Sequence, residues 1–82
     1  MQIGDGKSLF SKMTIMNAIQ IDIVERNRLA ATGYYSRVKH VLDRYEREGK
    51  YLVHSEIFPN EITLYHWPIN DYRYGSDVVH LY

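Results

Sequence analysis

The sequence predicts an α+β fold of three helices and a small antiparallel β-sheet, on the strength of three observations. Residues 29–53 have the pattern of a short helix, a glycine turn, a longer helix, a second glycine and the start of a strand. Two short runs rich in β-branched and aromatic residues flank Pro59-Asn60, which is typical of a hairpin. The chain has only 82 residues, so these elements belong to one domain.

The first predicted helix covers residues 8–18. Ser8 is a residue type that caps helix N-termini. Leu9, Met13 and Met16 follow it at helical spacing, so they would lie on one face. We expect the helix to end near Ala18 and the residues before Ser8 to be a loose N-terminus, residues 1–7.

The period then changes to two. Ile19, Ile21 and Ile23 alternate with polar residues, a pattern that favours a short strand over residues 19–23. A first helix that continues through Ile23 is the alternative, because short apolar runs fit either structure.

A second helix is expected over residues 25–32, with Leu29 and Ala30 facing inward. Gly33 would end it, because the residue after a helix C-terminus commonly takes a positive φ. A third helix follows over residues 34–48 and ends at Gly49.

This third helix has the clearest pattern in the chain. Val38, Val41, Leu42 and Tyr45 fall at positions i, i+3, i+4 and i+7, which predicts one buried face. Acid-first i,i+4 spacing also predicts two solvated ion pairs on this helix, Asp43 with Arg47 and Glu46 with Lys50.

The C-terminal half is predicted to be β-structure. Residues 51–56 and 62–67 form the two strands of the hairpin. We divide the chain into the loose N-terminus, a domain over residues 8–68 and a tail over residues 69–82. The tail is expected to hold a last strand, over residues 78–82, or to serve as a dimerisation segment.

This order of elements resembles the winged helix-turn-helix superfamily. The residues that carry the resemblance cover about 25 positions well and about 60 loosely. They are Leu29-Ala30, Thr32-Gly33, Ser36-Arg37-Val38, Val41-Leu42, Tyr45, Glu48-Gly49 and Tyr51-Leu52-Val53.

The resemblance implies a small DNA-binding protein, a transcriptional regulator whose helix 34–48 enters the major groove of double-stranded DNA. A homodimer is implied as well, because two half-sites raise affinity. Base contacts would come from Ser36, Arg37, His40 and Arg44. Backbone contacts would come from Arg28, Tyr35, Lys39 and Lys50.

The charge distribution leaves a second hypothesis open. The formal net charge is zero, and the hairpin turn carries Glu56 and Glu61 without any Lys or Arg. Seven of the ten basic residues nevertheless lie in residues 26–50 with only three acidic ones, so this window carries +4 and the remainder −4.

The alternative function is a protein-interaction module of the same fold, an inhibitor or adaptor of the kind that viruses and mobile elements encode. Exposed aromatic residues near the hairpin and in the tail would then contact the partner. The candidates are Phe58, Trp67, Tyr72 and Tyr74, and the tail is the expected dimer surface with Val78, Val79 and Leu81.

The sequence gives little support to other classes. It has no cysteine, no phosphate-binding glycine loop and no nucleophile motif, so we expect neither an enzyme nor a cofactor. A metal site made by His54, His66 and Glu56 across the hairpin is a weak alternative. The chain has neither a signal-peptide pattern nor a long apolar run, so a cytoplasmic location is expected.

Overall fold

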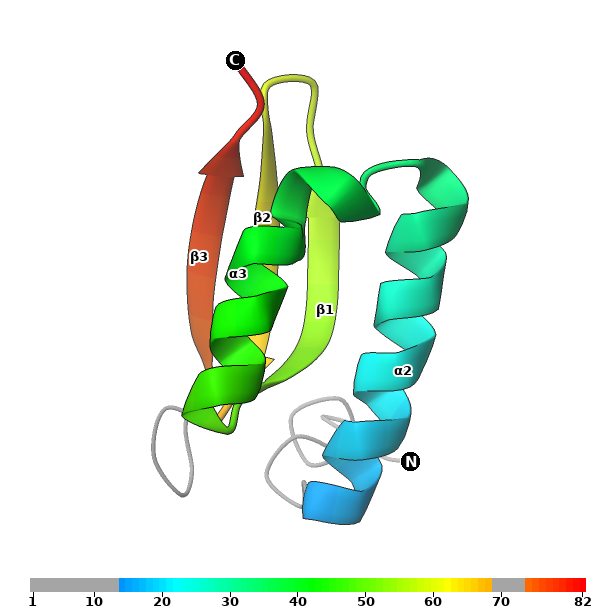
Figure 1. Ribbon diagram of the computed structural model, residues 1–82, viewed down its shortest axis with the longest axis vertical. Helices are drawn as coiled ribbons and strands as arrows, with labels where there is room; N and C mark the ends of the chain where they lie inside the picture. The colour runs from blue at the N-terminus through cyan, green and yellow to red at the C-terminus, as the bar shows by residue number, and fades with distance from the viewer. Residues whose placement is uncertain (1–13, 69–73) are drawn as a thin grey trace, which may run out of the picture.

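The computed structural model describes residues 14–68 and 74–82. Figure 1 shows how the helices lie beside the sheet. The elements are α2 (Ile15–Thr32), α3 (Tyr35–Glu48), β1 (Tyr51–Ile57), β2 (Glu61–Trp67) and β3 (Gly75–His80). The predicted α+β class is confirmed, although the described residues hold two helices instead of three.

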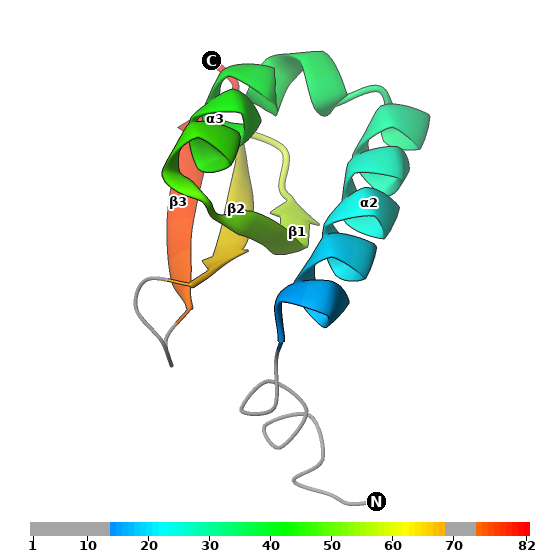
Figure 2. The same cartoon turned by 60° about the horizontal axis from the view of Figure 1, so that its bottom comes forward.

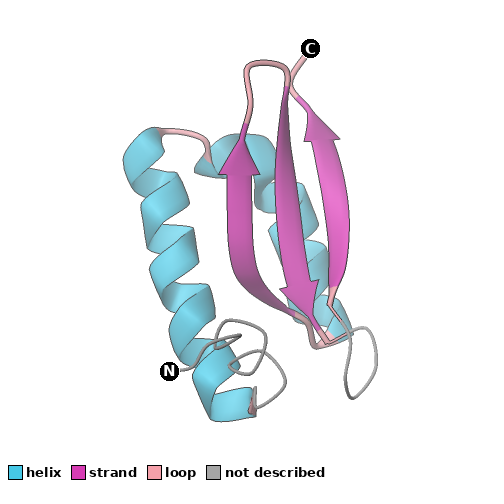
Figure 3. Cartoon of the chain, turned by 180° about the vertical axis from the view of Figure 1, so that it is seen from behind, coloured by secondary structure: helices cyan, strands magenta, loops and turns pink. Residues whose placement is uncertain are grey.

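The three strands form one antiparallel sheet in the order β1-β2-β3. α3 lies across one face of this sheet, and α2 runs alongside β1 (Figure 2). The opposite face carries no helix within the described residues, as the view from behind shows (Figure 3). Both helices therefore keep one long side turned away from the sheet.

The strand expected over residues 19–23 is wrong, because these residues lie inside the single helix α2. α2 also replaces the separate helices expected to end near Ala18 and to begin at Glu25. The alternation of isoleucines is compatible with a helix that is apolar on two sides. Ile19 and Ile23 are exposed on one side, whereas Ile21 packs beside buried Ala18 on the other.

The two ends of α2 have identifiable causes. The Thr14 hydroxyl accepts a hydrogen bond from the Asn17 N–H at 3.2 Å, so Thr14 caps the helix, and the predicted cap Ser8 lies outside the described residues. Gly33 ends α2 at φ 85°, as predicted. Leu29 is fully buried, but Ala30 is exposed, so its predicted inward position is wrong.

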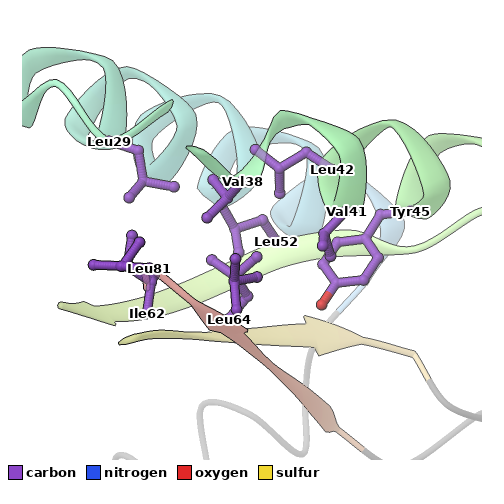
Figure 4. Packing of buried hydrophobic residues seen from close by; sticks show 10 residues of the cluster. Leu29, Val38, Val41, Leu42, Tyr45, Leu52, Ile62, Leu64 and Leu81 are labelled. Atoms are coloured by element: carbon purple, nitrogen blue, oxygen red, sulfur yellow. The ribbon is translucent and has the colours of Figure 1, made fainter. Parts of the chain in front are cut away.

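The main core lies between α3 and the sheet. The four residues predicted to form the buried face of α3, namely Val38, Val41, Leu42 and Tyr45, are all buried. They pack with Leu29 of α2 and with residues of all three strands (Figure 4). The strand and C-terminal members of this core are Leu52, Ile62, Leu64, Val79 and Leu81.

The hairpin is confirmed at Pro59-Asn60, with Ile57 opposite Ile62 in the last pair before the turn. The last strand starts earlier than the predicted residues 78–82, at Gly75, and ends at His80. Leu81 then binds back to the hairpin, because its N–H donates to the carbonyl of Asn60 at 3.0 Å. The C-terminal segment is thus part of the sheet and of the core.

Within the described residues, no helix combines the length and the apolar character that crossing a bilayer requires. α2 is the longest, with 18 residues, but it carries ionisable residues in its second half.

Candidate functional site

The outward side of α3 is the first candidate surface, because the DNA hypothesis places base contacts there. Ser36, Arg37 and His40 are exposed, as that hypothesis requires. Lys39, however, forms an ion pair with Asp43 at 3.0 Å. Asp43 therefore pairs with Lys39 and not with Arg47, the predicted partner.

The two arginines expected to read bases turn toward the C-terminal strand. The Arg37 guanidinium donates a hydrogen bond to the carbonyl oxygen of Leu81. Arg44 forms an ion pair with Asp77 of β3 at 3.3 Å and lies over the ring of Tyr45. Both side chains therefore help to hold β3 and the C-terminus against α3.

The other predicted cations also have partners. Arg28 binds Glu25 at 3.0 Å, and it donates to the Ser55 carbonyl and hydroxyl at 2.9 and 2.7 Å. Lys50 pairs with Glu48 at 3.0 Å and not with Glu46, the predicted partner. Of the arginines and lysines in the described residues, Arg47 alone lies outside the observed ion pairs and hydrogen bonds.

A second set of polar contacts ties α2 to β1 and α3. Asp22 accepts a hydrogen bond from the Leu52 N–H at 2.8 Å and one from Arg26 at 2.6 Å. Arg26 continues to Glu46 of α3 at 3.1 Å. Sequence reasoning missed this link, although the acid-first i,i+4 spacing of Asp22 and Arg26 is the signal that would have found it.

Ser55 of β1 and Glu25 of α2 add a contact at the same edge of the sheet, because the Ser55 hydroxyl donates a hydrogen bond to the Glu25 carboxylate at 3.1 Å. Burial alone would raise the pKa of the Glu25 carboxyl, but hydrogen bonds from Arg28 and Ser55 lower it below its ordinary value. Because Asp22 and Arg28 satisfy backbone groups of β1, α2 blocks this strand from pairing with another chain.

Asp77 is the centre of a third polar cluster, which joins α3 to β2 and β3. It accepts a hydrogen bond from the Tyr45 hydroxyl, pairs with Arg44 and lies 3.7 Å from His66 Nε2. Burial, then the hydrogen bond to Asp77, raises the pKa of Tyr45. Burial and the charge of Lys50 lower the pKa of His66.

The polar groups of this cluster bind one another, so the cluster holds α3 against β2 and β3. The exception is His66 Nδ1, which is buried and makes no hydrogen bond within the described part of the chain. Asp77 lay outside every sequence prediction, because nothing local distinguishes it from other acidic strand residues.

The residues predicted to contact a partner protein differ in how exposed they are to solvent. Phe58 is 44% exposed at the hairpin turn and remains available. Trp67 is only 8% exposed, and Tyr74 packs against the small cluster around Trp67, Val53 and Ala18. Tyr72 lies outside the described residues.

The predicted dimer surface in the tail is also altered. Val79 and Leu81 are 9% and 7% exposed and belong to the main core, so they cannot contact a second molecule. Val78 is 48% exposed on the uncovered side of the sheet. Burial of Val79 and Leu81 follows from the sheet, since alternate strand residues point to the helix-covered face. Trp67 lies opposite Tyr51 and is buried instead in the small cluster with Val53 and Ala18.

The largest group of exposed apolar side chains lies on α2, where no functional residue was predicted. Five of the eight large apolar residues that are exposed in the described part of the chain belong to this helix. We call them the outer face of α2: Ile15 (60% exposed), Met16 (69%), Ile19 (36%), Ile23 (51%) and Val24 (63%). The sequence analysis missed this surface because it assigned the isoleucines to a strand.

A shallow groove of about 300 Å³ continues this surface between the two helices. It is lined by Ile23, Arg26, Asn27, Ala30 and Tyr35. Tyr35, predicted beside the DNA backbone, is half-buried and packs against the main core. Its position near α2 makes it part of the groove wall.

The weak metal hypothesis is wrong in its geometry. His66 is opposite Leu52 in the register and His54 is opposite Tyr65, so the two imidazoles point to opposite faces of the sheet. Within residues 14–68 and 74–82, no group of three or more His, Asp or Glu side chains is arranged to hold a metal ion.

Comparison with known proteins gives no relative: no family model, no curated protein and no solved structure matches this chain. The function is therefore argued from the surfaces described above.

Proposed function

We propose that this chain is a protein-interaction module that binds another polypeptide through the outer face of α2. The observation that carries the proposal is the exposure of Met16 (69%), Ile23 (51%) and Val24 (63%) on a helix whose other side is already packed against β1. A helix that is apolar on both sides is typical of one with a second contact.

The size of this surface supports the proposal. The five side chains span about half of the helix circumference and together expose roughly 500 Å² of mostly apolar area, which is comparable with the largest patches on monomeric proteins. Leaving this area in water costs free energy that a partner would recover. Isolated exposed apolar residues need no such explanation, but five on one helix do.

The state of the cations argues in the same direction. A DNA-reading helix supplies charges that neutralise phosphates. Here Lys39, Arg44 and Lys50 are each paired with an acidic side chain, and Arg37 is bound to a backbone carbonyl. Phosphates would have to compete with these partners.

DNA reading by α3, in a winged-helix arrangement, is the second candidate function. It is favoured by the exposed Ser36, His40 and Arg47, which project from α3 on the side away from the core. Under this hypothesis the ion pairs of Lys39 and Arg44 would exchange partners on binding.

A titration of fluorescent duplex DNA with the pure protein separates the two functions. We expect no saturable rise in anisotropy even at about 50 mM salt, where phosphate neutralisation is strongest. A rise that weakens at about 200 mM salt, and that the double variant Arg37→Ala/Arg44→Ala abolishes, would establish DNA reading instead.

Affinity capture from a lysate of the source cell tests the protein-binding side. We expect the tagged chain to retain one defined protein after nuclease treatment. An untagged copy of the same chain counts as such a protein. Ile23→Lys should lose this protein, whereas Arg37→Ala/Arg44→Ala should keep it. Loss only in the arginine variant would contradict the proposal.

A further inference from the structure

We infer that the polypeptide on the outer face of α2 is a second copy of this chain, held in an antiparallel α2–α2 pair about a two-fold axis. The inference rests on the proposed function and names its partner. Three observations carry it: the spacing of the apolar residues, the absence of unpaired charge around them, and the area they expose.

The spacing makes the face complementary to itself. Met16, Ile19 and Ile23 fall at positions i, i+3 and i+7, so they form one apolar stripe along the outward side of the helix. The centre of this stripe lies between Ile19 and Gln20, with Met16 and Ile23 at equal distances on either side. A two-fold axis through that point, perpendicular to α2, places each Met16 against Ile23 of the second copy. It also brings the two Ile19 side chains together at the axis.

The same face carries no unpaired charge, because Arg26, which lines the groove beside Ile23, is paired with Asp22 and Glu46. From Ile15 to Ala31, the exposed residues are apolar or neutral except Arg28, which is held by Glu25 and Ser55. Two identical charged faces would repel each other, but two neutral faces do not. A strongly charged partner, in contrast, would find no complementary group here.

The area is sufficient for a specific contact. An antiparallel contact centred on Met16, Ile19 and Ile23 has Ile15 and Val24 at its two flanks. With the exposed neighbours Gln20 and Asn27 it would bury on the order of 1,000 Å² in total, which is about the size at which an interface becomes a biological one. Ala30 and the groove beside Tyr35 would add to it at each end. The antiparallel arrangement also sets the positive end of each helix dipole beside the negative end of the other.

Sedimentation of the pure chain is the first test. We expect a dimer for the wild type and a monomer for Ile23→Lys, with the dissociation constant raised about 100-fold. Val78→Lys is the matched control, because Val78 has nearly the same exposure (48% against 51%) but lies on β3. It should remain dimeric.

Cysteine crosslinking is the second test, and the chain suits it because it contains no cysteine. A mixture of the single variants Met16→Cys and Ile23→Cys should form a disulfide between the two chains under mild oxidation. Neither variant alone should do so. In the antiparallel pair, like residues lie about 10 Å apart along the axis, beyond disulfide reach.

The outcomes separate this inference from the proposed function. A dimer in which each variant crosslinks to itself would overturn the antiparallel arrangement. A monomeric wild type would overturn the inference. The outer face of α2 would then be covered by residues 1–13 or by a different protein. Specific capture of another protein that Ile23→Lys abolishes would then leave the proposed function standing. Duplex binding by the pure protein would overturn the proposed function instead.

Discussion

Asp22 shows how much one buried side chain contributes to this small domain. It satisfies the Leu52 N–H and the Arg26 guanidinium, which are both largely removed from water. Asp22→Ala should lower the free energy of unfolding by about 3 kcal/mol, because it leaves a buried donor and a partly buried charge without their main partner. Urea unfolding followed by circular dichroism measures this loss.

The control for Asp22 is Asp43, whose ion pair with Lys39 is at the surface. Asp43→Ala should cost under about 0.5 kcal/mol, since exposed pairs contribute little. Equal losses in the two variants would contradict the role that we assign to Asp22.

His66 predicts a dependence of stability on pH. Burial, then the charge of Lys50, lowers its pKa in the folded state. The unfolded chain therefore takes up a proton near pH 6.5, the ordinary value, before the folded chain does. Stability falls as the pH drops below about 6.5 and is independent of this group above it.

Urea midpoints at about pH 7.5 and 5.5 test this expectation in the wild type and in His66→Gln. The variant should lose less stability between the two values. If the urea midpoint changes equally between the two pH values in the wild type and in His66→Gln, His66 does not cause the pH dependence.

At the scale of elements, the junction between α2 and α3 depends on Gly33. Its φ of 85° lies in the left-handed region, where a Cβ is unfavourable although there is space for one. Gly33→Ala should destabilise the protein by about 1 kcal/mol. Gly33→Asn should cost less, since asparagine tolerates this region, and thermal unfolding would show the order. Equal losses would mean that φ is not the cause.

The elements differ in how far the sequence predicted them. α3 and the hairpin followed from local patterns, because Val38, Val41 and Leu42 mark one face and Pro59-Asn60 marks the turn. α2 was misread because Ile19, Ile21 and Ile23 satisfy a strand period and also two faces of a helix. Only the position of β1 beside this helix decides between them.

The candidate site could not be predicted for a related reason. An exposed apolar face and a buried one look alike in sequence. The outer face of α2 can be identified only from the structure, which shows that the opposite side of the helix packs against β1. The partners of the cations were equally hidden. Asp77 meets Arg44 across 33 residues of sequence, and local spacing carries no information on such a contact.

For the whole molecule, dimerisation predicts a stability that depends on concentration. A chain of 82 residues forms a small core, and a second copy would add buried apolar area. The melting temperature of the wild type should rise with protein concentration, because the partner binds only the folded state. The melting temperature of Ile23→Lys should stay constant over the same range, and a rise in both would contradict the role of α2.

The most direct measurement is an isotope-filtered nuclear Overhauser experiment on an equal mixture of labelled and unlabelled wild-type chains. It detects contacts between chains and ignores contacts within one chain. We predict cross-peaks from the Met16 methyl of one chain to the Ile23 methyls of the other, and between the two Ile19 side chains. Cross-peaks that involve only Phe58 or Val78, or none at all, would contradict the account.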